Sequence, residues 1–245
     1  MKLLRVALVL AFIFSGMGWL QAEEANWQVG LARIDITPTR PILMDGYASR
    51  REPFEAVASP IHAKAIALKD EAGNRALLIN AEILGFHDEL SERIARRINE
   101  STGLPREAIL ISATHTHSGP MVLPIALGGE VPEAQWQEVL RYSRELEDKV
   151  VEISQKALQE MSPAQISWGV GSAPFVSNRR EFTEKGVILG LNPEGPVDRS
   201  VPVLRVDGLD GNPSAVLFGT ACHCTTLGGK NYHICGDYAG FAQDC

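Results

Sequence analysis

The stretch AILISATHTHSGP, residues 108–120, decides how the rest of the chain is interpreted. An apolar run passes into small hydroxyl-bearing residues and two histidines, and Gly119-Pro120 then breaks the pattern. The run at 108–113 is typical of a buried β-strand. An ordinary strand end has no need of imidazoles, so His115 and His117 indicate a metal site or a proton-transfer site where this strand ends.

The segments around this stretch have the periodicity of further strands. Apolar or alternating runs bounded by turn residues predict strands over 27–36, 62–69, 75–84, 164–171, 201–206 and 214–221. The sequence DEAGN separates the second and third of these runs, and DGLDGNP separates the last two. Both are hairpin signals. The polar segment VSNRREFTEKG, residues 176–186, is expected to be a loop.

Two long helices are expected between the strands. Apolar residues recur at helical spacing in 88–100, where Leu90, Ile94 and Ile98 share one face, and again in 133–161. Strand pairs joined by tight turns, with long helices inserted, predict an α/β (mixed α+β) domain. We expect a layered mixed β-sheet with helices.

The last ten residues, GDYAGFAQDC, predict a third and short helix. Asp237 could cap it, and Tyr238, Phe241 and Ala242 would face inward. The pattern stops after about two turns without a C-terminal capping signal. We therefore expect the chain to be the front part of a longer protein, with a fold that is incomplete at its C-terminal end.

The first residues have the pattern of a targeting segment. Lys2 and Arg5 precede the apolar run 6–20, and small residues stand near Ala22. This pattern predicts a signal peptide over 1–22, cut after Ala22, and a secreted or periplasmic protein whose residues 23–245 form one domain. The alternative is a membrane anchor, but the run is short of the roughly 20 residues that a membrane span needs.

Composition and charge exclude several classes of protein. With 45% hydrophobic and 22% charged residues, the chain is globular rather than disordered or fibrous. Cleavage after Ala22 would take the formal net charge from -7 to -9. An acidic protein without a cluster of Lys and Arg is a poor candidate for binding nucleic acid. The chain also lacks a GxGxxG motif and a P-loop.

Four cysteines stand in the last 24 residues: Cys222, Cys224, Cys235 and Cys245. An exported protein can form disulfides, and four thiols allow three pairings among which the sequence does not choose. In a strand, Cys222 and Cys224 would share one face and His223 would point to the other. Free buried thiols or a disulfide are therefore favoured over a metal cluster of these residues.

Three of the six histidines follow the ends of predicted strands. If the chain is extended there, His115 and His117 point to the same face, about 6.5–7 Å apart, and His223 follows the strand at 214–221. Two imidazoles at that spacing can both bind zinc, or one can bind while the other transfers protons. Ordinary hydrogen-bonded roles are expected for the other three: His62, His87 and His233.

One acidic residue near the predicted site has two interpretations. Glu82 stands in INAEILG, close to a strand end. It could be a buried acid beside the site, or a structural carboxylate paired with an arginine.

Five separated motifs together resemble a known family. They are VGLARIDITP (29–38), MDGYASR (44–50), ILISATHTHSGP (109–120), SNRR (177–180) and ACHCTTLGGKNYHICGDYAGFAQ (221–243). In this order they resemble the neutral/alkaline non-lysosomal ceramidases. The resemblance covers the chain from about Val29 to its last residue.

The resemblance implies a zinc-dependent amidase that hydrolyses the N-acyl bond of ceramide or a related N-acyl lipid, in sphingolipid metabolism. It implies that His115 and His223 bind Zn²⁺ and that His117 and Arg179 are catalytic. It also implies that a Glu and a Tyr beyond Cys245 complete the zinc ligands. An N-acyl lipid substrate makes peripheral contact with a membrane surface a further expectation.

The chain departs from the family pattern at two motifs. Cys224 stands where the family has Pro, and NRREF replaces the Ser-Pro that often follows Asn-Arg. The second change alters a position that helps shape the substrate entrance, so the acyl substrate stays open. The sequence specifies neither the oligomeric state nor the state of the thiols, nor the roles of Glu82 and Asp237.

Two other functions stay open. One is an exported, catalytically incomplete fragment or a non-enzymatic binding protein. This alternative is supported by the presence of only two protein ligands, because catalytic zinc normally has three plus water. For the same reason the 245-residue chain alone is expected to be inactive. The other is a different metal hydrolase with an HxH pair, although the regular strand–helix alternation of an amidohydrolase barrel is missing.

Overall fold

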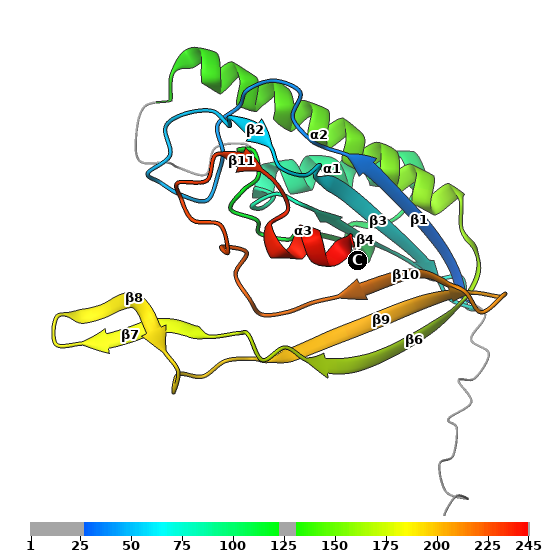
Figure 1. Ribbon diagram of the computed structural model, residues 1–245. Coiled ribbons are helices and arrows are strands. Elements are labelled where there is room, and N and C mark those ends of the chain that lie inside the picture. Colours follow the sequence, from blue (N-terminus) through cyan, green and yellow to red (C-terminus); the bar gives the residue numbers. More distant parts are fainter. Residues whose placement is uncertain (1–26, 123–130, 245) are drawn as a thin grey trace, which may run out of the picture.

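The computed structural model describes residues 27–122 and 131–244, and its centre is a seven-stranded mixed sheet (Figure 1). The strand order is β10-β9-β6-β1-β3-β4-β5, and only β4 and β5 are parallel neighbours. The bounds are β1 Trp27–Asp35, β3 His62–Lys69, β4 Arg75–Ala81, β5 Ile109–Ala113, β6 Ser162–Ser172, β9 Ser200–Gly208 and β10 Pro213–Phe218. Every strand predicted from the sequence is present, and the mixed α/β class is confirmed.

Some of the sequence predictions concern residues outside the described ranges. The signal peptide over 1–22 and Cys245 both fall there, as do residues 123–130. The shorter described elements are β2 Ala56–Val57, β11 His233–Ile234 and the 3-10 helix Arg106–Ala108, and β2 pairs with β11 in parallel.

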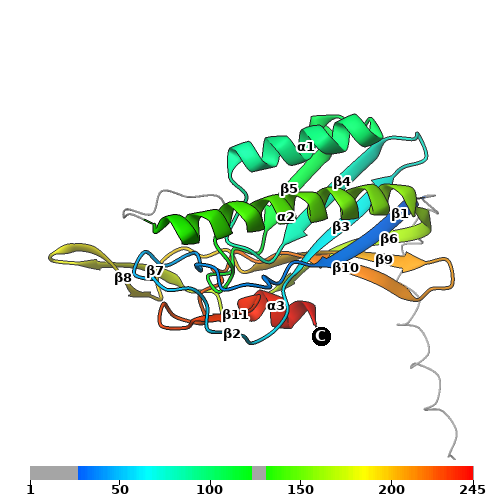
Figure 2. The ribbon, with the colours of Figure 1, turned by 90° about the horizontal axis from the view of Figure 1, so that it is seen from above.

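Two helices cover one face of the sheet (Figure 2). The helix α1 spans Asp88–Thr102, and α2 spans Glu133–Gln159 and packs on β1 and β3. Small residues on β3 (Ala63, Ala65 and Ala67) are buried beneath the helices, as alternation along a strand requires. The main core lies between these helices and the sheet.

Gly30 on β1 marks the closest approach between the sheet and α2. A Cβ atom at this position would lie 1.8 Å from the Ala157 carbonyl oxygen and 3.0 Å from Cγ of Met161. Only a hydrogen atom fits between these backbones. Gly30 therefore sets the distance at which α2 packs on β1.

The helix α1 has the apolar face expected from its sequence. Leu90, Ile94 and Ile98 are all fully buried. The helix ends at Gly103, whose φ of 69° is the left-handed conformation that glycine adopts at little cost.

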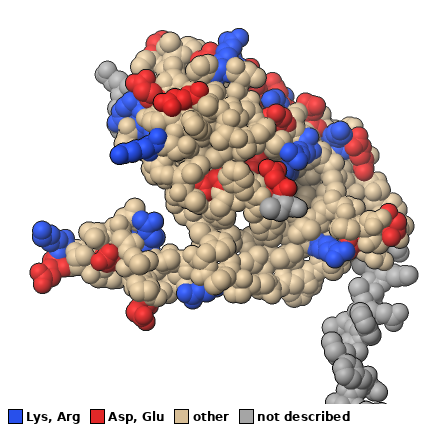
Figure 3. Space-filling view, viewed as in Figure 1, with Lys and Arg blue, Asp and Glu red and all other residues tan. Residues whose placement is uncertain are grey.

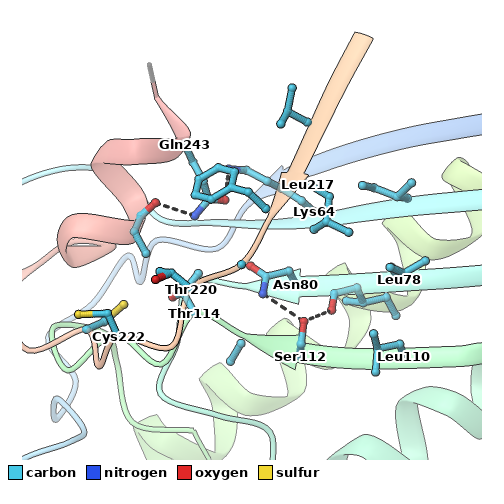
Figure 4. A pocket seen from close by; sticks show the side chains of 18 of the residues that line it. Lys64, Leu78, Asn80, Leu110, Ser112, Thr114, Leu217, Thr220, Cys222 and Gln243 are labelled. Carbon is cyan, nitrogen blue, oxygen red and sulfur yellow. Dashed lines mark hydrogen bonds between the residues drawn. The ribbon is translucent and has the colours of Figure 1, made fainter. Parts of the chain in front are cut away.

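The opposite face of the sheet is only partly covered. The helix α3, Asp237–Gln243, lies over it, and a hollow of about 370 Å³ is lined by α3, by β10 and by the strands β3, β4 and β5 (Figure 4). In this hollow Asn80 donates a hydrogen bond to Ser112, and Lys64 donates one to Gln243. The first bond joins β4 to β5, and the second joins β3 to α3.

Large apolar side chains on this second face lie open to solvent. Leu110 is 58% exposed, Val170 is 64% exposed and Trp168 is 82% exposed. The layer formed by β6, β9 and β10 shows few charged side chains in the space-filling view, whereas charges gather around α2 (Figure 3). None of the described helices is long and apolar enough to cross a membrane.

The prediction of a loop over residues 176–186 is wrong. The segment forms β7, Asn178–Thr183, which pairs antiparallel with β8, Gly186–Asn192. This hairpin projects from the end of the sheet (Figure 1). Glu184 and Lys185 form the turn, and Gly186, with a φ of 109°, begins β8 directly after it.

The inward face predicted for the last helix is also partly wrong. Tyr238 is half-buried, but Phe241 is 57% exposed and Ala242 is exposed. The helix is anchored through its first turn, where Asp237 and Gly240 are buried, rather than along a continuous apolar stripe.

Candidate metal centre

The first histidine of the cluster is held where β5 leaves the sheet. His115 follows the strand end and has a φ of 61°, which is uncommon for a residue other than glycine. Its Nδ1 lies 2.7 Å from the Leu84 carbonyl oxygen. Donation from Nδ1 leaves the Nε2 lone pair free, which is how metal-binding histidines are usually oriented.

The second histidine is enclosed by a loop from the start of the chain. His117 is 9% exposed, and the Tyr47 ring packs edge-on against it with centroids 5.0 Å apart. Gly46, with a φ of 94°, is so close that a Cβ atom there would lie 2.5 Å from the His117 ring. His117 Nδ1 is buried without a hydrogen-bond partner.

The third histidine comes from the loop after β10. His223 is exposed, and its Nε2 lies 2.8 Å from Nε2 of His117. The two segments are also joined through the backbone, because the His117 amide donates to the Cys224 carbonyl oxygen at 3.1 Å.

The buried carboxylate of Asp237 orders the loop that follows His223. It accepts hydrogen bonds from the backbone amides of Thr226 and Leu227 as well as that of Tyr238. Asp237 therefore ties this loop to the first turn of α3. The capping role considered for it is wrong, because Gly236 is the N-cap residue, no side chain caps α3, and Asp237 is the first residue of the helix.

Together the three imidazoles form a site that suits a transition metal. One nitrogen each from His115, His117 and His223 lie within 4.8 Å of one another. The ring centroids are 5.1 Å apart for His115 and His117, and 4.6 Å apart for each of the other two pairs. Imidazole nitrogens are preferred zinc ligands, and the facing Nε2 atoms of His117 and His223 have no other described partner. The donor set therefore fits a zinc ion.

The pKa values of two of the imidazoles are lowered by their surroundings. The pKa of His117 is lowered to about 4, first by removal of its ring from water and then by the nearby His223 and His115. The pKa of His223 is lowered by the same loss of solvation, and then by His115 and Arg180. Neutral rings are the form that binds metal or accepts a proton.

This shift predicts how the metal-free protein responds to acid. In the unfolded chain His117 takes up a proton near pH 6.5, whereas in the folded chain it does so near pH 4. The contribution of the neutral His117 ring to the free energy of unfolding is therefore complete above about pH 6.5, and it is lost as the pH falls to about 4. We expect a loss of about 2 kcal/mol, after allowance for solvent screening.

Urea unfolding in the presence of a chelator, at pH 7.5 and at pH 4.5, would measure this loss. The comparison is between wild type and His117→Gln, with His87→Gln as the control at an exposed histidine. Equal pH dependence in wild type and His117→Gln would contradict the assignment.

The structure places Arg179 on the projecting hairpin. Its Nε donates to the Gly190 carbonyl oxygen at 2.8 Å, and no hydrogen bond joins it to the three histidines among the described residues. The neighbouring Arg180 is the arginine whose charge lowers the pKa of His223. A catalytic role for Arg179 stays a prediction.

The remaining polar residues named from the sequence have structural contacts. Glu82 is buried, accepts a hydrogen bond from the His62 amide at 2.6 Å and pairs with the His62 ring rather than with an arginine. His87 and His233 are exposed. Neither lies in the metal-binding cluster found among the described residues.

The described thiols do not form a disulfide. Cys222, Cys224 and Cys235 are free, and the last two are buried. Burial raises the pKa of Cys224 to about 11, so this thiol stays protonated and unreactive at neutral pH. The segment is a loop rather than a strand, so the alternation expected for residues 222–224 does not apply.

Comparison with known proteins shows which family the sequence resembles. The family profile described as "Neutral/alkaline non-lysosomal ceramidase, N-terminal" matches residues 27–245. Neutral ceramidase A of Dictyostelium discoideum is 26% identical over 98% of this chain and 35% of its own length. Neutral ceramidase of Pseudomonas aeruginosa is 23% identical over 91% of this chain and 34% of its own.

Two solved structures have a similar fold. A structure titled "Ceramidase complexed with C2" superposes with a TM-score of 0.70 at 22% identity, covering 89% of this chain and 34% of that one. The crystal structure of neutral ceramidase from Pseudomonas aeruginosa also gives 0.70, at 20% identity, covering 90% of this chain and 35% of that one. The chain thus spans about a third of the length of these relatives. By the match of the family profile over nearly the whole described chain, it belongs to the neutral/alkaline non-lysosomal ceramidase family.

Proposed function

We propose that this chain supplies the histidines of a zinc-dependent amidase that hydrolyses the N-acyl bond of ceramide or a related N-acyl lipid. The observation that carries the proposal is the convergence of His115, His117 and His223 within 4.8 Å, in a chain of the ceramidase family. The names of the relatives support an amide of a long-chain base as the substrate class.

In this proposal the histidines have separate roles. His115 and His223 hold the ion through ring nitrogens, and His117 accepts a proton at Nε2 from the attacking water. When bound, zinc supplies a water of lowered pKa and polarises the amide carbonyl. The His117 ring is neutral at neutral pH, so it presents an unprotonated nitrogen to the site.

Arg179 is proposed to orient the polar part of the substrate or to stabilise the developing negative charge. A guanidinium suits this role because its charge is permanent and its donors form a fixed fork. The bond from its Nε to Gly190 occupies only one of its five N–H groups.

Export is part of the proposal. The segment 1–22 would direct the chain to the periplasm or out of the cell and be cut after Ala22. The mature protein would then meet its lipid substrate at a membrane surface. Mass spectrometry of the protein from the native compartment would test the cleavage site.

A panel of N-acyl amides tests the function, with the polypeptide that the whole gene encodes, because the relatives are about three times as long as this chain. We expect hydrolysis of N-acyl sphingoid bases, complete loss with a chelator and recovery on adding Zn²⁺. Hydrolysis that continues unchanged in the presence of the chelator would contradict the zinc mechanism. A protein that binds zinc and lipid without turnover would favour the binding-protein alternative, and turnover of other amides alone would favour a different metal hydrolase.

A further inference from the structure

A buried arginine outside the predicted site connects the loops that carry the histidines. Arg50 is 3% exposed and donates to backbone carbonyl oxygens on every side. Nη1 bonds to Asp45 at 2.8 Å and to His117 at 2.5 Å, Nη2 bonds to Asn231 at 2.8 Å, and Nε bonds to Gly229 at 3.4 Å. No described carboxylate forms an ion pair with it.

The position of these acceptors explains why an arginine is needed. The carbonyls of Asp45, His117 and Asn231 come from three separate stretches of the chain, and they lie around one planar group. A guanidinium presents five donors in a rigid fork, whereas an ammonium group is a compact point charge on a flexible stem. The Tyr47 and Tyr232 rings lie 4.7 Å and 5.8 Å from Cζ of Arg50, a further favourable contact for a planar cation.

The loop that carries Arg50 also fixes the His117 ring. Gly46 and Tyr47 pack against that ring from one side, and Arg50 binds the carbonyl of the same residue. The loop is tied on to the segment after His117, because the Asp45 amide donates to Gly119 at 3.1 Å. His117 is therefore held at its ring and at its backbone by one short loop.

The second arm of the guanidinium reaches the segment that follows His223. Gly229 and Asn231 lie between that histidine and β11, and the side-chain Nδ2 of Asn231 donates to Ser118 Oγ at 3.1 Å. A change at Arg50 would thus loosen the two histidine-bearing segments relative to each other, without touching any imidazole.

We propose that Arg50 is a positioning residue: its guanidinium clamps the His117 segment to the 229–231 segment and so sets the geometry of the three imidazoles. The inference rests on the proposed metal site. Without this guanidinium the three histidines are still present, but the distances between their ring nitrogens increase. Metal binding therefore weakens and the coordination geometry changes.

The test compares Arg50→Lys and Arg50→Met with Arg51→Lys and Arg51→Met in the full-length protein. Arg51 is the matched control, because it is exposed and, among the described residues, its side chain donates only to the nearby carbonyls of Ala48 and Arg50. The readouts are the dissociation constant for Zn²⁺, by competition with a chromophoric chelator, and the visible absorption spectrum with Co²⁺ in place of Zn²⁺.

We expect both Arg50 variants to bind Zn²⁺ at least about tenfold more weakly and to shift the Co²⁺ bands, as loss of groups that orient metal ligands does. Both Arg51 variants should match wild type. Unchanged affinity and spectrum in a folded Arg50 variant would overturn the clamp and leave the metal site intact. Failure of wild type to bind either metal would instead remove the proposed function.

A measurement on wild type covers the case in which both Arg50 variants fail to fold. The Nε proton of Arg50 can be followed by ¹⁵N NMR with and without Zn²⁺. We expect its exchange with solvent to slow when the ion binds, because the ion and the guanidinium then hold the same two segments. Equal exchange rates would overturn the proposal.

Discussion

Replacing His115 or His223 with alanine is expected to abolish zinc retention by the full-length protein, and hydrolysis with it. Each supplies one of the few imidazole nitrogens that meet at the cluster. Catalytic zinc normally has three protein ligands, so removal of one leaves too few to hold it. The zinc content, measured by atomic absorption after gel filtration, should fall from about one ion per chain to less than about a tenth.

The His117→Ala variant distinguishes between the two roles considered for His117. If it transfers protons, the variant keeps its zinc and loses turnover; if it is a third ligand, zinc is lost as well. His87→Ala is the control, because this side chain is exposed and lies outside the cluster. Full zinc content in both His115→Ala and His223→Ala would remove the assignment of these residues as ligands.

Replacing Gly30 with alanine is expected to destabilise the fold by about 3 kcal/mol. The added methyl group would lie 1.8 Å from the Ala157 carbonyl oxygen. This neighbour is helix backbone, which cannot rotate aside as a side chain does. The whole of α2 would have to move away from β1 and open the main core.

Gly169→Ala is the matched control for that experiment. Gly169 also lies in a strand of the same sheet, β6, but nothing stands within 4 Å of the position where its Cβ would be. Urea unfolding should show a lower midpoint for Gly30→Ala and a midpoint close to that of wild type for Gly169→Ala. Equal midpoints for the two variants would show that α2 is not seated on Gly30.

Periodicity alone identified the helix-covered layer. Buried apolar residues recur at helical spacing in α1 and at every second position in β3. Several residues therefore indicate each of these elements. The β7–β8 hairpin has no such signal. Its apolar residues, such as Phe182 and Leu189, are exposed, and its charged residues look like those of a loop.

The histidines of the site were identifiable from the sequence, but the parts that hold them were not. His115 and His117 stand out because two imidazoles at a strand end are unusual. His223 also follows a predicted strand, and the resemblance to the family adds its role as a ligand. Arg50 and Asp237 act through backbone carbonyls and amides. Any residue can supply these groups, so the partners of such a side chain leave no pattern in a sequence.

The bond between His117 and His223 joins positions 106 residues apart. Between them lie α2, β6 and the strands that follow, so this contact forms only after most of the domain has closed a very long loop. An ion held by His115 and His223, which stand in the same two segments of the chain, then meets a chain that is already folded. Binding of the ion would slow unfolding and would have little effect on the folding rate.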